Sequence, residues 1–405
     1  MTDTANRTVE SLLSSRAQRI GGGRLGNPRA SANLISFVAG FPDPGSLPKR
    51  DITEATRVAL ERDGEWALQY GAGRGYPDLV RELLTKLKRD QGIEAGEENV
   101  LITAGAGQAL GLICEALCDP GDVILSEEPT WSGAVHAFRR VAAEVVPVPL
   151  DAEGTDTAAL EATLARLAAA GRAPKLLYMI PTFQNPTGVT TTLARREQII
   201  ALSRQYGFFI VEDDAYFDLR FEGARVPTLY SLAPDRVAYL GTFSKIMAAG
   251  MRLGWIVASP ELIAACAAFK SEGGTSAFAG AVAAAFCSSG TLVEHIGELK
   301  SLYHRRRDVM LQTLAETMPE GVRWSRPEGG FFIWLTLPDG VDAAAMAEKA
   351  QERGMQYLPG TACHFGGRGQ QTIRLSYSFA DDEQIRQGIA ILAGLIREEL
   401  PVAAG

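Results

Sequence analysis

Short apolar runs alternate with segments of helical periodicity between residues 100 and 260. The runs are rich in β-branched residues, as in "NVLIT" and "KLLYMI", and the segments between them include "TLARREQIIALSRQYG". The seven runs are residues 99–103, 122–128, 143–150, 175–180, 208–213, 237–243 and 254–259. Continuous apolar strands that alternate with helices favour a parallel sheet covered on both faces. We therefore predict an α/β domain with a mostly parallel seven-stranded sheet in three layers.

The pattern changes toward the C-terminus. Residues 291–316 predict one long charged helix, which is followed by hairpin-like pieces such as "GVRWSRPEGGFFIWLTLP" and "QTIRLSYSF". This pattern indicates a second, smaller α+β domain. We expect residues 1–48 to form an N-terminal segment that joins the small domain, residues 49–275 to form the large domain, and residues 276–405 to form the small C-terminal domain.

Composition excludes several classes of protein. The chain of 405 residues is 46% hydrophobic, which is enough for a large core, and its net charge of −8 comes without a basic run. Nucleic acid and anionic membranes are therefore poor partners. The five cysteines are an odd number without metal-ligand spacing, so we expect buried thiols, no metal and a reducing compartment. The polar N-terminus and the absence of a long apolar run favour a cytoplasmic location.

Polar, glycine-rich and proline-rich pieces directly follow five of the predicted strands. They are "AGAGQ", "PTW", "PTFQNPTG", "DAY" and "SK". Ligands of open parallel sheets bind at the carboxyl ends of the strands, so these five loops are expected to converge on one site.

One part of this site has the residues of an anion site. "TAGAGQAL" (103–110) places small residues where a strand passes into a helix, which leaves backbone N–H groups open to an anion. By itself this stretch favours an ordinary glycine turn over an anion site. Thr242, Ser244 and Arg252 add two hydroxyl groups and a guanidinium, which together suggest a phosphate-binding cup.

Four further residues suggest a heteroaromatic cofactor, although each has a plain structural interpretation. Asp213 ends a strand and needs a cationic partner, such as an arginine or a protonated ring nitrogen. Asn185 precedes a proline and either forms a turn or donates to a ring oxygen. Trp131 either packs in the core or stacks on a flat ring. Lys245 either reaches solvent or, with a lowered pKa, reacts with an aldehyde. Taken together, these residue types are the requirements of pyridoxal phosphate (PLP).

The chain resembles the fold type I, class I/II PLP-dependent aminotransferases, and most of all the branch of 2-aminoadipate and kynurenine/aromatic aminotransferases. The resemblance runs from about Ile35 to Glu399. It is carried by "ISFVAGFPDPGSLP", "LQYGAGRGYPDL", "EEPTW", "PTFQNPTG", "VEDDAY", "GTFSKIMAAGMRLGW", "PEGGFFIW" and "IRLSYS", in that order. It implies a PLP-dependent aminotransferase that moves an amino group between an L-amino acid and a 2-oxo acid.

The resemblance also implies roles for individual residues. Lys245 would form the Schiff base with the cofactor and later carry the proton, while Asp213 would pair with the pyridine nitrogen. Asn185 and Tyr216 would hold the ring oxygen, and Trp131 would stack on the ring.

Other positions follow from the same resemblance. The phosphate would be held by Thr242, Ser244, Arg252 and the backbone of Ala106 and Gly107. In a homodimer, Tyr70 would reach the phosphate in the neighbouring subunit. Arg374 would bind the substrate carboxylate, and Gly40 and Asn185 would lie beside it.

The sequence constrains the substrate and the reaction less than it constrains the cofactor. Relatives usually have Gly-Ser-Gln-Gln in the first phosphate loop, whereas this chain has Gly-Ala-Gly-Gln at 105–108, which leaves only backbone groups. We expect an apolar, aromatic or aminoadipate-like substrate, with Arg19, Arg24, Arg29 and Arg74 as candidates for a second carboxylate. Decarboxylation, elimination or oxidation at Cα is the alternative reaction, since sequence does not fix which bond breaks. A regulator is disfavoured because no basic helix-turn-helix precedes the matching region.

Overall fold

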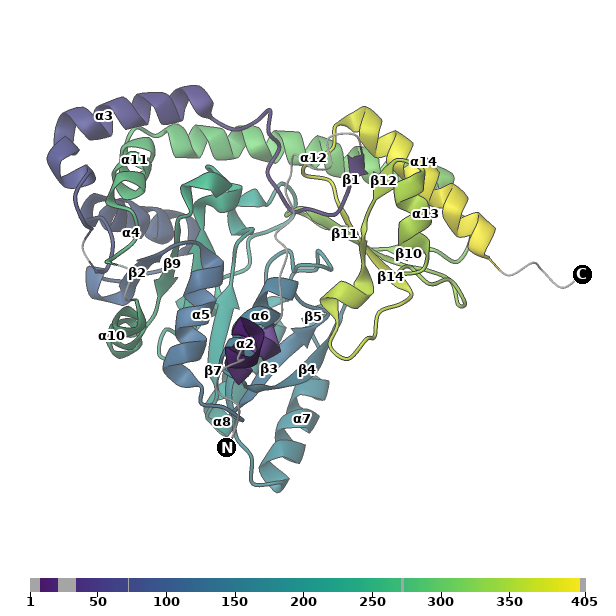
Figure 1. The fold of residues 1–405 in the computed structure, drawn as a ribbon, viewed down its shortest axis with the longest axis horizontal. Coiled ribbons are helices and arrows are strands. Elements are labelled where there is room, and N and C mark those ends of the chain that lie inside the picture. The colour runs from purple at the N-terminus through teal and green to yellow at the C-terminus, as the bar shows by residue number, and fades with distance from the viewer. Residues whose placement is uncertain (1–7, 21–33, 72, 271–272, 401–405) are drawn as a thin grey trace, which may run out of the picture.

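The computed structural model describes residues 8–20, 34–71, 73–270 and 273–400, and its centre is one large sheet (Figure 1). The strand order is β2-β9-β8-β7-β6-β3-β4-β5. All seven predicted runs form strands, namely β2 (Val100–Thr103), β3 (Val123–Glu128), β4 (Glu144–Asp151), β6 (Pro174–Met179), β7 (Phe209–Asp213), β8 (Val237–Thr242) and β9 (Gly254–Val257). β9 is antiparallel to both of its neighbours, and the pairs from β8 to β4 are parallel.

The predicted count of seven strands is one too low. An eighth strand, β5 (Gly154–Thr155), pairs antiparallel with the end of β4 through a tight turn. Two residues are too few to show an apolar period, so this strand left no pattern in the sequence.

Helices cover both faces of the large sheet, which confirms the predicted three layers. On one face, α5 (Ala106–Leu117), α6 (Ser132–Arg140) and α10 (Pro260–Phe269) pack in a core that includes Leu176 and Tyr178. On the other face, α7 (Thr157–Ala169), α8 (Leu193–Tyr206) and α9 (Leu229–Leu232) pack in a core that includes Leu177 and Met179. Alternate residues of the same strand therefore enter different cores, as the period of a β-strand requires.

A smaller antiparallel sheet follows, in the order β10-β11-β14-β13. Its strands are β10 (Arg323–Trp324), β11 (Phe332–Thr336), β13 (Leu358–Pro359) and β14 (Thr372–Ser376). The helices of this region are α12 (Thr291–Thr317), α13 (Met346–Glu352) and α14 (Asp382–Glu399). α12 runs across the molecule and packs against α14 (Figure 1).

The remaining elements pack against one another or against elements already described. α11 (Ala277–Ser288) packs against α3 (Lys49–Ala67) and α4 (Pro77–Gln91). β1 (Ile35–Ser36) pairs in parallel with β12 (Met355–Gln356). The short helix α2 (Ser15–Ile20), which follows α1 (Val9–Leu12), contacts α6. The domain boundaries near residues 48 and 275 stay predictions.

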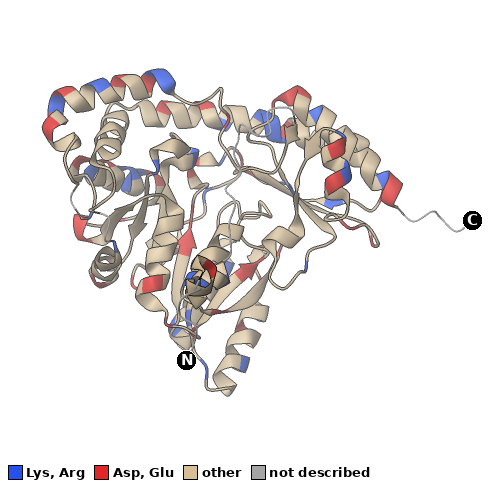
Figure 2. Ribbon diagram, viewed as in Figure 1, with Lys and Arg blue, Asp and Glu red and all other residues tan. Residues whose placement is uncertain are grey.

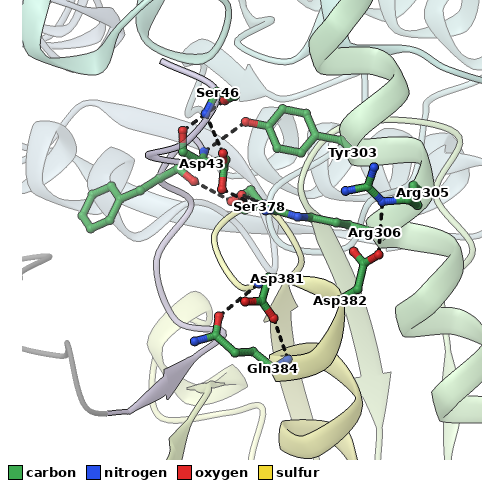
Figure 3. A network of polar contacts seen from close by, with 10 residues as sticks. Asp43, Ser46, Tyr303, Arg305, Arg306, Ser378, Asp381, Asp382 and Gln384 are labelled. Carbon is green, nitrogen blue, oxygen red and sulfur yellow. Dashed lines mark hydrogen bonds and ion pairs between the residues drawn. The ribbon is translucent and has the colours of Figure 1, made fainter. Parts of the chain in front are cut away.

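The segment that follows β1 is fixed to the small domain by polar contacts. Ser376 N donates to the Phe37 carbonyl (2.9 Å), and the Ser378 hydroxyl donates to the Phe41 carbonyl (2.7 Å). Asp43 accepts from the Arg306 guanidinium at 2.8 Å, inside the network drawn in Figure 3. These contacts hold residues 37–43 in an extended path that passes the carboxyl edge of the large sheet.

The outer surface carries both signs of charge. Lys and Arg alternate with Asp and Glu along the outer helices, without a large area of one sign in this view (Figure 2). Of the described helices, none alone has the length and apolar character of a membrane span; α11 and α12 pass that test only as a pair, bent by 81°.

Candidate active site

The strand-end loops meet at one pocket of about 220 Å³. Ten of the predicted residues line it, namely Ala106, Gly107, Trp131, Asn185, Asp213, Tyr216, Thr242, Ser244, Lys245 and Arg252. Gly105, Ile180 and Ala215 complete the wall. Loops that are up to about 150 residues apart in the chain therefore come together at the carboxyl edge of the sheet, as expected for this class of fold.

Lys245 ends the short 3-10 helix η3 (Phe243–Lys245), directly after β8. Its Nζ donates to the Gly40 carbonyl at 2.9 Å. Burial in the pocket, together with the nearby charges of Arg374 and Arg252, lowers the pKa of this amine to about 8, and Asp213 opposes the shift. A large fraction of this lysine is therefore neutral slightly above neutral pH, which is the nucleophilic form.

Asp213 ends β7 and is 3% exposed. Its Oδ2 accepts a hydrogen bond from the Tyr178 hydroxyl at 2.8 Å, while its Oδ1 has no partner among the described residues. Burial raises the pKa of this carboxyl to about 6, and Tyr178, Lys245 and the backbone N–H of Ala215 limit the rise. A buried carboxylate oxygen that lines a pocket without a protein partner is open to a donor from a ligand or from water.

Arg374, on β14, does not line this pocket but contacts the lining residue Asn185. One Nη donates to Asn185 Oδ1 at 2.9 Å, and the other donates to the Val38 carbonyl. The guanidinium carbon lies 4.3 Å from the centre of the Phe332 ring. The guanidinium is thus held by neutral groups and an aromatic face, and its Nε has no partner among the described residues.

Tyr216 lies beside this group, enclosed by aromatic rings. It makes edge-to-face contacts with Phe331 and Phe332, at 5.4 and 5.7 Å between centroids. Burial raises the pKa of its phenol, so the hydroxyl stays protonated and acts as a donor near neutral pH.

Backbone and side-chain donors form an anion cup at the other end of the pocket. α5 begins at Ala106, so the free N–H groups of its first turn face the site. Gly105 has φ +92°, and a Cβ there would lie 2.9 Å from an Arg252 nitrogen. Arg252 donates to the Ala104 carbonyl at 2.9 Å, and the Thr242 hydroxyl lies 2.9 Å from Ser244 Oγ. This group fits a phosphate.

Some predicted residues lie outside the pocket. Tyr70 is 88% exposed and lines a separate hollow with Gly71 and Phe278. Gly40 contributes through its carbonyl to Lys245. Arg74 is exposed and donates to the Glu98 carbonyl. Arg19 is exposed on α2, and Arg24 and Arg29 lie outside the described residues.

The sequence did not predict three residues near the site, namely Tyr178, Glu127 and Gln184. Tyr178 contacts Asp213 as described above. Glu127 is fully buried and accepts from Thr155 Oγ1 (2.8 Å), Ile180 N (2.9 Å) and Gln184 Nε2 (3.3 Å). Gln184 Oε1 in turn accepts from Thr187 N at 2.9 Å, which fixes the loop that carries Asn185. The sequence signal for Glu127 was its position at the end of an apolar strand, because a buried acid there needs several hydrogen-bond donors.

Comparison with known proteins agrees with this geometry. The sequence profile of "Aminotransferase class I and II" matches residues 33–392. An aromatic-amino-acid aminotransferase of Thermococcus litoralis is 40% identical over 91% of this chain and 89% of its own. A 2-aminoadipate transaminase of Thermus thermophilus is 35% identical over 90% of each chain. The structure of a kynurenine aminotransferase of Pyrococcus horikoshii, in complex with PMP, superimposes with a TM-score of 0.92 at 38% identity, over 97% and 99% of the chains.

The fold, the pocket and these relatives define a fold type I enzyme that uses PLP. The chain belongs to the class I and II aminotransferases, and it is a PLP-dependent aminotransferase.

Proposed function

We propose that the pocket holds PLP with its phosphate at the start of α5 and its ring between Trp131 and the strand ends. The observation that carries this placement is the unpartnered Asp213 Oδ1, which lines the same pocket as the Lys245 amine. Thr242, Ser244 and Arg252 would bind the phosphate, and Asp213 Oδ1 would accept from the protonated pyridine nitrogen. Asn185 and Tyr216 would donate to the ring oxygen.

PLP, when bound, supplies a ring that withdraws electrons from the Cα of an attached amino acid. The chain itself supplies the proton carrier. Lys245 would hold the aldehyde group and, once displaced by the substrate amine, would take the Cα proton on Nζ and return it at the carbon that had carried the aldehyde. A pKa near 8 suits both directions of this transfer near neutral pH. Arg374 and Asn185 would fix the substrate carboxylate, which sets the direction of the Cα–H bond.

For the substrate we propose an L-amino acid with an apolar, aromatic or aminoadipate-like side chain, and a 2-oxo acid as acceptor. The names of the relatives support this choice. The apolar lining residues Trp131, Ile180 and Ala215 support an apolar substrate surface. Besides Lys245 and Arg252, the lining of the pocket in this chain contains no cation among the described residues.

A panel of amino donors with 2-oxoglutarate or pyruvate tests this proposal. We expect aromatic and long-chain donors to give kcat/KM values roughly tenfold or more above those of aspartate, because each additional buried methylene or ring adds to transition-state binding. Amino product and oxo product should form in equal amounts, as measured by chromatography. Release of CO2 or ammonia without amino transfer would instead support another reaction at Cα.

We also propose a homodimer in which Tyr70 completes the site of the neighbouring subunit. The end of α3 and the residues after it expose Trp66, Leu68 and Tyr70 at 72%, 72% and 88%. Exposed apolar residues at this density usually mark a protein interface. The cytoplasmic location stays a prediction.

Mixed dimers test the role of Tyr70. We expect Tyr70→Phe to weaken PLP binding roughly tenfold, because one hydrogen bond to a charged group is lost. A mixture of Tyr70→Phe and Lys245→Ala subunits should regain activity, since one site of the mixed dimer then has both intact residues. Activity assays after co-refolding measure this. If the mixture, assayed at limiting PLP, is no more active than the Tyr70→Phe parent, Tyr70 does not act across an interface.

A further inference from the structure

Tyr178 is a fully buried tyrosine inside an apolar strand, and its hydroxyl forms a hydrogen bond with the active-site residue Asp213. It lies on β6, next to β7, whose last residue is Asp213. The Tyr178 hydroxyl donates to Asp213 Oδ2 at 2.8 Å. The ring packs edge-to-face on Phe138 of α6, with centroids 5.6 Å apart. The contact with α6 therefore holds the Tyr178 ring in place, and the position of the ring determines the position of its hydroxyl.

Because of this contact, the two carboxylate oxygens of Asp213 have different surroundings. Oδ2 is satisfied by Tyr178, and Oδ1 has no partner among the described residues and lines the pocket. A carboxylate held at one oxygen cannot rotate freely, so its second oxygen keeps one direction. A hydrogen bond to a buried carboxylate also stabilises the charged form.

The phenol remains protonated and available as a donor. Burial raises the pKa of Tyr178 well above its usual value, and the neighbouring Asp213 adds to the rise. Without this donor, Oδ2 would be a second buried oxygen without a partner, and the carboxyl would hold its own proton more tightly.

We propose that Tyr178 is a positioning residue that keeps Asp213 ionised and aims Oδ1 at the pyridine nitrogen of the cofactor. The inference rests on the proposed placement of Asp213 at that nitrogen. A carboxylate stabilised by Tyr178 leaves the proton on the ring nitrogen, and a protonated ring is the stronger electron acceptor. Loss of the phenol would move this proton toward Asp213 and slow turnover, while phosphate contacts at the far end of the pocket would remain.

The test uses the holoenzyme loaded with PLP that carries an NMR-active isotope at the pyridine nitrogen. Three variants are compared with the parent: Tyr178→Phe, Asp213→Asn and Tyr357→Phe. Tyr357 is the matched control, because it is a buried tyrosine whose hydroxyl donates to the Ala343 carbonyl (2.7 Å) in the small domain. Its variant should keep both the nitrogen signal and kcat.

For Tyr178→Phe we expect the nitrogen signal to move toward the unprotonated position and kcat to fall roughly 10- to 100-fold. If Tyr178→Phe instead gives the nitrogen signal and the kcat of the Tyr357→Phe control, the inference is overturned. If Asp213→Asn also leaves the nitrogen signal unchanged, the placement of Asp213 is wrong and the inference fails with it. If Asp213→Asn moves the signal and Tyr178→Phe does not, only the role of Tyr178 fails.

A second variant covers the case in which Tyr178→Phe does not fold. Fluorotyrosine at position 178 keeps the ring and the hydroxyl but makes the phenol a stronger donor. The Asp213 carboxyl of its apoenzyme, followed by carbon NMR, should titrate at a lower pH than that of the parent. An unchanged titration would overturn the inference.

Discussion

Lys245→Ala should bind PLP and still fail to turn over. The anion cup around Arg252 and the Asp213 carboxylate do not depend on this amine, so cofactor affinity should fall only moderately. Proton transfer at Cα needs a base within reach, and Lys245 Nζ is the amine of the pocket. General acid–base catalysis typically contributes 10²–10⁴-fold, so kcat should drop by at least roughly this factor. Stopped-flow absorbance of the first half-reaction measures the effect.

Lys86→Ala is the control for this variant. Lys86 is also buried, but it is paired with Asp218 at 2.8 Å and with Asp90 at 3.4 Å. Its loss should reduce stability, because Asp218 loses this cation while Asp90 keeps Arg89 at 2.7 Å, and leave kcat of the folded enzyme unchanged. Added small primary amines should restore part of the Lys245→Ala activity. Near-normal transamination by Lys245→Ala would refute the assigned role.

The position of the site could be predicted from sequence because it depends on the order of elements. Each apolar strand ends at a polar piece, and the carboxyl ends of parallel strands share one edge. Lys245, Asp213 and Asn185 occupy such ends, and the structure brings all three to one pocket.

Contacts made by strand interiors could not be predicted in the same way. Tyr178 lies within "KLLYMI", where a tyrosine is an ordinary core residue, and only its register with β7 brings it to Asp213. The partner of Lys245 is a carbonyl of Gly40, about 200 residues away. Such pairs depend on how the sheet and the N-terminal segment meet in space, and no local period encodes that.

Arg374→Ala should cost about 2–5 kcal/mol of transition-state binding for amino acid substrates, as for a desolvated charge pair that loses one partner. The guanidinium is buried, contacts Asn185 and lies over Phe332, without a carboxylate in these contacts. It is therefore available for the substrate carboxylate, which it can bind through two nitrogens. KM should rise and kcat/KM should fall roughly 30-fold or more, while PLP affinity changes little. Steady-state kinetics and cofactor titration measure the two quantities.

A comparison of substrates makes this prediction specific for the carboxylate. The parent should prefer an amino acid strongly over the amine that lacks the carboxylate, and Arg374→Ala should lose most of this preference. Arg220→Ala is the matched control, because Arg220 also lies over an aromatic ring, at 4.5 Å from the centre of Phe183, but is paired with Glu328 at 2.7 Å. Arg220 is already neutralised by its own carboxylate, so its loss should affect stability and leave the preference intact. An unchanged preference in Arg374→Ala would place the carboxylate site at another cation of the chain.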